Sequence, residues 1–277
     1  MVRSIDLAFK LRLFPYTTQS KLINFLMKIS IVTICFNSQE TISRTLQSID
    51  SQDYLDYEHI IIDGASSDST LKIIDRHPNP RRNVYSKKDR GIYDAMNNGL
   101  KVASGDIVVF LNSDDFYVDS VVLSTVVKKF DDPKLQALFG DTEYFSKGDS
   151  SRIVRRYSSA KFNSSSLSRG LMPAHPTLFL RREVYLKHGY YDADYKIAGD
   201  FEFIARVFKD DSVKYLYLPE VIVSMQLGGV STSGLRSTLL LNKEILRACK
   251  KNNIPANYAK LLLRYPQKLL EYFIFTG

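Results

Sequence analysis

The sequence predicts an α/β protein built on a mostly parallel sheet that is flanked by helices. Three strand-like hydrophobic runs, at residues 29–34, 59–62 and 107–111, alternate with helical patterns over roughly 85 residues. This order favours parallel pairing through right-handed crossovers. Asp63 directly follows the second run, and Asp114 and Asp115 come three and four residues after the end of the third. The alternation and the acidic strand ends together predict an open sheet with a ligand site at its carboxyl edge.

The elements of this half follow from local patterns. Asn37 and Ser38 break the first strand and can cap the helix that follows. A second strand ends at Asp63, and loop residues then lead into a short helix through Arg76. A short strand near Val84 comes next. The half is completed by a helix over residues 93–102, which ends near Gly105, and by the strand over residues 107–111.

The pattern changes after Asp115, where long loops separate the remaining elements. We expect a mobile serine-rich loop at residues 158–169. The other predicted elements are strands at residues 137–145, 177–180 and 221–223 and helices at residues 183–188, 200–209, 235–251 and 256–275.

Three regions are expected along the chain. Met27 stands directly before the first strand and reads as a natural start, so residues 1–26 are expected to be an N-terminal extension outside the fold. Residues 27–230 form the main domain, and residues 231–277 form a C-terminal helical appendage.

Composition narrows the class of protein and its partners. The chain has 277 residues and a formal net charge of +8, which favours anionic partners such as nucleotides or an anionic membrane surface. Cys35 and Cys249 are far apart and form no metal pattern, which favours a reducing compartment. No run reaches the roughly 18 apolar residues of a membrane span. We therefore expect a cytoplasmic protein.

The strongest candidates for binding a ligand or metal lie in Asn112-Ser113-Asp114-Asp115, where a predicted buried strand is followed by two adjacent carboxylates. Adjacent carboxylates repel each other, and a hard divalent cation such as Mg²⁺ or Mn²⁺ is one reason for them to coexist. The alternative is a loop cap with a solvated neighbour. Asp63 at the end of the second strand could accept hydrogen bonds from a nucleobase or ribose, or could simply form a turn.

Two common nucleotide sites are disfavoured. No Gly-x-Gly-x-x-Gly follows the first strand, and the chain contains no Gly-x-x-x-x-Gly-Lys-Ser/Thr. The sequence thus predicts neither a dinucleotide site nor a P-loop, and acids at one sheet edge suit a nucleoside-diphosphate ligand with its cation.

Five motifs occur in order along the chain. They are Thr33-Ile34-Cys35-Phe36-Asn37, Asp63-Gly64-Ala65-Ser66-Ser67-Asp68-Ser69-Thr70, Gly91-Ile92-Tyr93-Asp94-Ala95-Met96-Asn97-Asn98-Gly99, Gly105-Asp106 and Leu111-Asn112-Ser113-Asp114-Asp115. In this order they resemble the motifs of family 2 glycosyltransferases, over roughly residues 28–230. The resemblance is closest to bacterial members that build exopolysaccharide or O-antigen units. It implies a GT-A fold, a nucleotide-sugar donor, a glycan or lipid-linked acceptor rather than nucleic acid, and inversion at the anomeric carbon.

The resemblance also implies roles for single residues. Asp200 matches the general base, and Asp114, with Asp115 beside it, stands at the metal-binding end of the Asp-x-Asp motif. Asp63 would contact the base or ribose. The remaining substrate-binding candidates are Thr33, Phe36, Asn37, Asp94, Asn112 and His175.

Two departures weaken the match. Asn112 replaces the first acid of Asp-x-Asp and supplies less charge, and Gly64 stands where many members carry a second acid. These departures leave the nucleotide and the metal affinity open. They also keep open a second possibility, a catalytically degenerate nucleotide-sugar-binding scaffold.

Several alternatives remain at this stage. Asp200 could cap its helix, and His175 could be a loop histidine satisfied by its neighbours rather than a contact to phosphate or acceptor. The aromatic, aliphatic and basic residues of 258–275 suit either a membrane-surface helix or packing against the domain or another subunit. A sugar-1-phosphate nucleotidyltransferase would need a glycine-rich loop with an arginine after the first strand. That place holds Cys35-Phe36-Asn37-Ser38, which argues against it.

Overall fold

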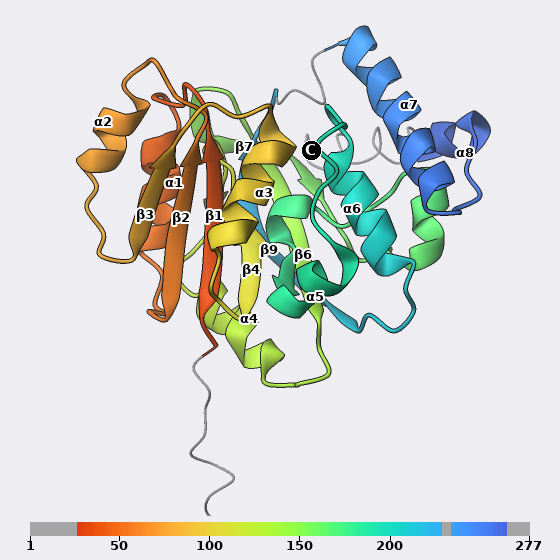
Figure 1. Cartoon of the computed structure of the whole chain (residues 1–277), viewed down its shortest axis with the longest axis horizontal. Helices are drawn as coiled ribbons and strands as arrows, with labels where there is room; N and C mark the ends of the chain where they lie inside the picture. The colour runs from red at the N-terminus through yellow and green to blue at the C-terminus, as the bar shows by residue number, and fades with distance from the viewer. Residues whose placement is uncertain (1–26, 229–233, 265–277) are drawn as a thin grey trace, which may run out of the picture.

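A computed structural model describes residues 27–228 and 234–264, and a nine-stranded sheet runs through the centre of this part (Figure 1). The strand order is β3-β2-β1-β4-β8-β6-β9-β5, with β7 paired to β6. The first four strands of this order are parallel, as predicted. Their bounds are β1 Ile29–Cys35, β2 Tyr57–Asp63, β3 Arg82–Ser86 and β4 Ile107–Phe110.

The second half of the sheet is mixed. β8 runs antiparallel to β4 and to β6, while β6 and β9 pair in parallel. The bounds here are β5 Phe116–Tyr117, β6 Ala137–Ser146, β7 Asp149–Tyr157, β8 Phe179–Arg181 and β9 Tyr215–Gln226.

Helices cover both faces of the sheet (Figure 1). Strand side chains alternate between faces, so Ile31 joins the core under α4 while its neighbour Val32 joins the core under α3, α5 and α6. α7 lies against the outer side of α6. The helices are α1 Ile42–Asp50, α2 Thr70–Asp75, α3 Ile92–Val102, α4 Val122–Phe130, α5 Arg182–His188, α6 Gly199–Phe208, α7 Leu235–Lys251 and α8 Tyr258–Leu262.

The structure adds three elements that the pattern did not predict, α4, β5 and β7. The expectation of a mobile loop at residues 158–169 was wrong, because a 3₁₀ helix spans Ser164–Arg169. Asn163 caps it, and Leu167 is completely buried. The predicted C-terminal helix falls only partly within the described residues, which end at Arg264. The predicted extension at residues 1–26 lies outside them.

Candidate active site

The parallel strands bring the predicted acids to one edge of the sheet. Cys35 at the end of β1 is level with Asp63 at the end of β2, and Val32 in β1 is level with Phe110 at the end of β4. The residues that follow these strands therefore share the carboxyl edge, where open α/β sheets bind ligands.

The loops after β1 and β2 are tied together by side chains. Asn37 adopts a left-handed backbone with φ of 50°, and its Oδ1 accepts the Ser67 N–H at 2.9 Å. Asp63 is completely buried and accepts hydrogen bonds from Ser66 N–H at 3.0 Å and the Ser86 hydroxyl at 2.6 Å. Asn37 and Asp63 thus shape the rim of the site from within, and Asn37 does not cap α1 as its sequence position suggested.

An aromatic ring and a carboxylate meet above this rim. Phe36 directly follows the buried strand β1, yet the residue is 62% exposed. A Cβ on Gly64 would lie 2.9 Å from Asp89 Oδ2 and 3.3 Å from Phe36 Cδ2. The Asp89 carboxylate therefore fills the space that a side chain at position 64 would need. Sequence reasoning missed Asp89, because only the fold brings it back to the end of β2.

The loop after β4 holds the second group of acids. Asp115 is 1% exposed and accepts the Asn112 Nδ2–H at 3.1 Å, while the Thr45 hydroxyl of α1 donates to the Asp115 carbonyl at 2.7 Å. Asn112 Oδ1 is buried and has no hydrogen-bond partner among the described residues. Burial raises the pKa of Asp114 and, with the neighbouring Asp114 charge, that of Asp115.

These residues fit a divalent cation. The uncompensated Asn112 Oδ1 and the Asp114 carboxylate are hard oxygen donors, the kind that Mg²⁺ and Mn²⁺ prefer. Within residues 27–228 and 234–264, no three His, Cys, Asp or Glu side chains gather as a metal cage. A cation bound through one or two protein ligands plus substrate phosphates needs no such cage.

Asp200 lies in the first turn of α6. Its Oδ1 accepts the Phe201 N–H at 2.7 Å and faces the Tyr93 hydroxyl at 3.4 Å. Because Ala198 occupies the cap position, Asp200 is not the N-cap residue of α6. Burial raises the pKa of Asp200 to about 6, although the Phe201 N–H and Tyr93 bonds oppose the rise. A carboxylate with such a pKa suits proton transfer near neutral pH.

Two other predicted substrate contacts, Thr33 and His175, lie in the core. Thr33 is completely buried in β1 and bonds His59 Nε2 at 2.9 Å. His175 is buried against Phe110, bonds the Tyr191 hydroxyl at 2.8 Å, and has its pKa lowered by burial to about 4. Both side chains are buried and hydrogen-bonded inside the core, which argues against their predicted contacts with substrate.

Asp94 lies in the first turn of α3, and its carboxylate bonds to the neighbouring residue Arg90. It accepts the Arg90 backbone N–H at 3.1 Å and pairs with the Arg90 guanidinium at 3.1 Å, contacts that lower the pKa of Asp94. The structure therefore gives Asp94 a role in shaping the turn before α3, next to Asp89.

Comparison with known sequences decides the family. The profile described as glycosyl transferase family 2 matches residues 30–189, more than half of the chain. The chain belongs to this family. An uncharacterised glycosyltransferase of Mycobacterium tuberculosis is 33% identical over 64% of this chain and 68% of its own length. A glycosyltransferase of PGL/p-HBAD biosynthesis from the same species is 28% identical over 79% of this chain and 82% of its own length.

Solved structures place the fold among GT-A glycosyltransferases. Staphylococcus aureus TarS in complex with UDP-GlcNAc aligns with a TM-score of 0.61 and 21% identity, over 79% of this chain and 67% of that one. The mannosyltransferase PcManGT of Pyrobaculum calidifontis, in complex with GDP-Man and Mn²⁺, aligns with a TM-score of 0.55 and 17% identity, over 87% and 79%. The predicted GT-A fold is confirmed, and this glycosyltransferase is an enzyme of that class.

The family match stops before Asp200. Residues 30–189 include Phe36, Asp89 and Asp114, whereas α6 and α7 follow them. The assignment of a base to α6 therefore depends on the geometry described above. Among the helices described, none combines the length and apolar character that crossing a bilayer requires.

Proposed function

We propose that this family 2 glycosyltransferase is an inverting enzyme that moves a sugar from a nucleoside-diphosphate donor to a hydroxyl acceptor. The observation that carries the proposal is Asp200, a partly buried carboxylate with a pKa of about 6 in the first turn of α6. Tyr93 ties it to α3, whose preceding loop bears Asp89. The proposed base is thereby linked to the carboxyl edge of the sheet, where the residues proposed to bind the nucleotide-sugar donor lie.

The donor is proposed to lie along the carboxyl edge of the sheet. The exposed Phe36 residue offers a ring face on which a nucleobase can stack. Asp89 accepts the Gly91 N–H through Oδ1, and its Oδ2, which has no hydrogen-bond partner among the described residues, can accept a base N–H. Asp114, with Asn112 Oδ1, would hold a Mg²⁺ or Mn²⁺ ion on the diphosphate. That ion, when bound, neutralises negative charge on the leaving group.

The reaction needs one displacement. Asp200 accepts the proton of the acceptor hydroxyl while the hydroxyl oxygen bonds to the anomeric carbon. The bond from that carbon to the diphosphate oxygen breaks, and its electron pair leaves with the nucleoside diphosphate. Attack from the face opposite the leaving group inverts the anomeric centre.

A panel of nucleotide sugars tests this function. UDP-glucose, UDP-GlcNAc, UDP-galactose and GDP-mannose would each be incubated with the protein and Mn²⁺, and nucleoside diphosphate release would be measured with and without EDTA. Release from one donor that EDTA suppresses is the expected result. Donor binding by calorimetry without any release would favour the alternative suggested by Asn112, a degenerate binding scaffold.

We further propose that the acceptor is a growing cell-envelope glycan or lipid-linked sugar, and that the enzyme works at the cytoplasmic face of the membrane. The support is the net charge of +8 together with the exposed Leu262 at the end of α8 and Leu263 directly after it. A relative at 28% identity is named for PGL/p-HBAD biosynthesis. Exposed leucines beside basic residues suit binding to an anionic lipid surface.

A further inference from the structure

Glu244 on α7 receives three backbone hydrogen bonds although it lies far from the motifs in sequence. Its side chain is almost fully buried, and Glu244 is 5% exposed. Oε1 accepts the Lys196 N–H at 2.9 Å, and Oε2 accepts the Ile197 and Ala198 N–H groups, each at 2.9 Å. Three charge-assisted bonds to consecutive amides hold a loop far more firmly than one neutral bond does.

The loop that Glu244 holds leads directly into α6. Ala198 is the cap residue of that helix, and Asp200 stands two residues later. From the opposite side, the Tyr93 hydroxyl of α3 donates to the Ile197 carbonyl at 2.6 Å. The segment before Asp200 is therefore clamped between α3 and α7, and a change in either contact would move the carboxylate.

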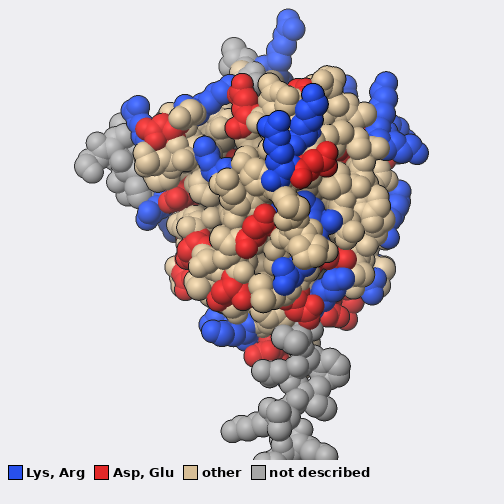
Figure 2. Space-filling model, turned by 90° about the vertical axis from the view of Figure 1, so that its left-hand side faces the viewer, with Lys and Arg blue, Asp and Glu red and all other residues tan. Residues whose placement is uncertain are grey.

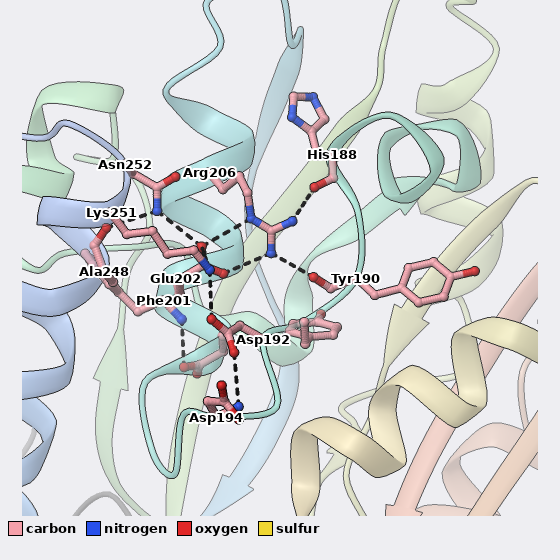
Figure 3. Close-up of polar contacts among 12 residues, drawn as sticks. His188, Tyr190, Asp192, Asp194, Phe201, Glu202, Arg206, Ala248, Lys251 and Asn252 are labelled. Carbon is pink, nitrogen blue, oxygen red and sulfur yellow. Dashed lines mark hydrogen bonds and ion pairs between the residues drawn. The ribbon is translucent and has the colours of Figure 1, made fainter.

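A second set of contacts anchors α7 to the same region (Figure 3). Lys251 at the end of α7 bonds Asp192 at 2.7 Å and Glu202 at 3.3 Å, and Glu202 also pairs with Arg206 at 2.9 Å. Glu202 is completely buried on α6. These ion pairs fix α7 against α6 without touching the three amides that Glu244 binds, so they provide a natural control.

Electrostatic interactions also connect Glu244 with Asp200. The titratable groups that act on Asp200 are Tyr93 on α3, Tyr191 in the loop before α6, and Glu244 on α7. Burial raises the pKa of Asp200, and the negative charge of Glu244 adds to the rise. Glu244 therefore acts on Asp200 both through the loop and through its field.

We propose that Glu244 is a positioning residue for Asp200 and makes α7 a required part of the catalytic unit. The inference depends on the proposed role of Asp200 as the base. It goes beyond the family match, which ends at residue 189, and it assigns a role to a helix that the sequence suggested was an appendage.

The test uses full-length Glu244→Gln, which keeps the size of the side chain but has only one acceptor oxygen. With the active donor of the panel, kcat should fall about tenfold or more, since small displacements of reacting groups are costly, while the donor KM should stay within about twofold. The midpoint of the pH–kcat profile should move to lower pH. Hydrogen exchange of the amides of residues 196–198 should accelerate. Glu244→Ala should show the same changes, larger in size.

Glu202→Gln is the matched control, because it alters an equally buried carboxylate at the α6–α7 contact. It should lower Tm but keep the pH midpoint and the exchange of residues 196–198. Glu244→Gln with wild-type kcat and midpoint would overturn the proposal, as would a loss of kcat matched by Glu202→Gln at equal loss of Tm. Asp200→Asn, run in parallel, separates the two ideas. If it transfers sugar normally, the base assignment fails, whereas the exchange data still report the Glu244 contact.

Discussion

Gly199 has almost no room for a side chain. A Cβ at this position would lie 2.7–2.8 Å from three atoms of the Tyr93 ring. Tyr93 in turn holds Ile197 and faces Asp200. The absence of a side chain at Gly199 therefore lets α3 and α6 approach closely enough for the clamp around Asp200 to form.

We expect Gly199→Ala to destabilise the protein by about 1–3 kcal/mol, the usual cost of overpacking. It should also lower kcat, because the ring or the start of α6 must shift. Denaturant unfolding and steady-state kinetics measure the two effects. In a double-mutant cycle with Tyr93→Leu, the two penalties should be less than additive. Strict additivity would contradict a steric origin.

Asp200 should give the enzyme a defined pH dependence. Since its pKa is raised from 3.8 to about 6, the carboxyl is protonated and unable to act as a base below that range. We expect kcat to rise with pH through a midpoint near 6, and Asp200→Asn to lower kcat by about 10²-fold or more. A flat profile between pH 5 and 7 would exclude Asp200 as the base.

The same shift has a consequence for stability. A folded-state pKa above the ordinary value means that the folded protein binds more protons than the unfolded chain between pH 3.8 and about 6. The contribution of Asp200 to stability thus falls as pH rises through this window. At pH 7 the neutral Asp200→Asn variant should be at least as stable as wild type, so thermal unfolding can separate lost catalysis from lost folding.

At the scale of elements, the contact between α6 and α7 depends on buried charge. Glu202 is completely buried and has cationic partners on both helices, Arg206 on α6 and Lys251 on α7 (Figure 3). The Asn252 amide also donates to it at 3.3 Å. Such a network contributes to stability only while it is complete, because removing one partner leaves the rest desolvated.

We expect Glu202→Ala to lower the free energy of unfolding by on the order of 3 kcal/mol, the range for a broken buried ion pair. Urea unfolding at neutral pH measures this loss. Lys187→Met provides the comparison, since Lys187 pairs with Asp210 on an exposed face and its side chain is 55% exposed. That variant should unfold almost as wild type does. If both variants lost the same free energy of unfolding, burial would not be what determines how much an ion pair contributes to stability.

The net positive charge of the chain does not mean that every face of the molecule is basic. The chain carries a net +8, yet the face seen in Figure 2 interleaves acidic and basic side chains. Leu262 and Leu263, 61% and 65% exposed, lie beyond α7, whereas Leu261 beside them is buried. The described part of the C-terminal segment therefore packs on the protein through Leu261 and Arg264, and the Leu262 and Leu263 side chains face outward.

We expect the full-length protein to co-sediment with anionic vesicles at low salt and to dissociate as salt rises. Replacing both Leu262 and Leu263 with Ser should weaken this binding without loss of donor turnover, since neither side chain enters the core. The buried Leu261 stays unchanged, which preserves the packing of α8. No binding of the full-length protein at low salt would assign the C-terminal residues to packing or oligomer contacts.

Much of the molecule could be predicted from local patterns. The run of Ile and Val from Ile29 onward, and the helix of residues 235–251, came out at or within one residue of their bounds, because their periods of hydrophobicity are regular. α4 was missed although it carries a clear apolar face, and β7 was missed because it is largely exposed and lacks a buried face. The order of the five motifs along the chain was enough to identify the resemblance to family 2 glycosyltransferases.

The sequence by itself determined the parallel half of the sheet, the edge at which the acids gather, and the membership of the glycosyltransferase family, since each depends on neighbours in the chain. Only the tertiary structure decided which of the predicted side chains are buried in the core and which neighbours the others have. In the folded protein Thr33 and His175 are buried in the core, and Asp89 lies against Gly64. Glu244 on α7 accepts hydrogen bonds from the loop that precedes Asp200. The hydrogen bonds made by Thr33, His175 and Glu244 join residues from 16 to 48 positions apart, and a local pattern of hydrophobicity carries no information about such separations.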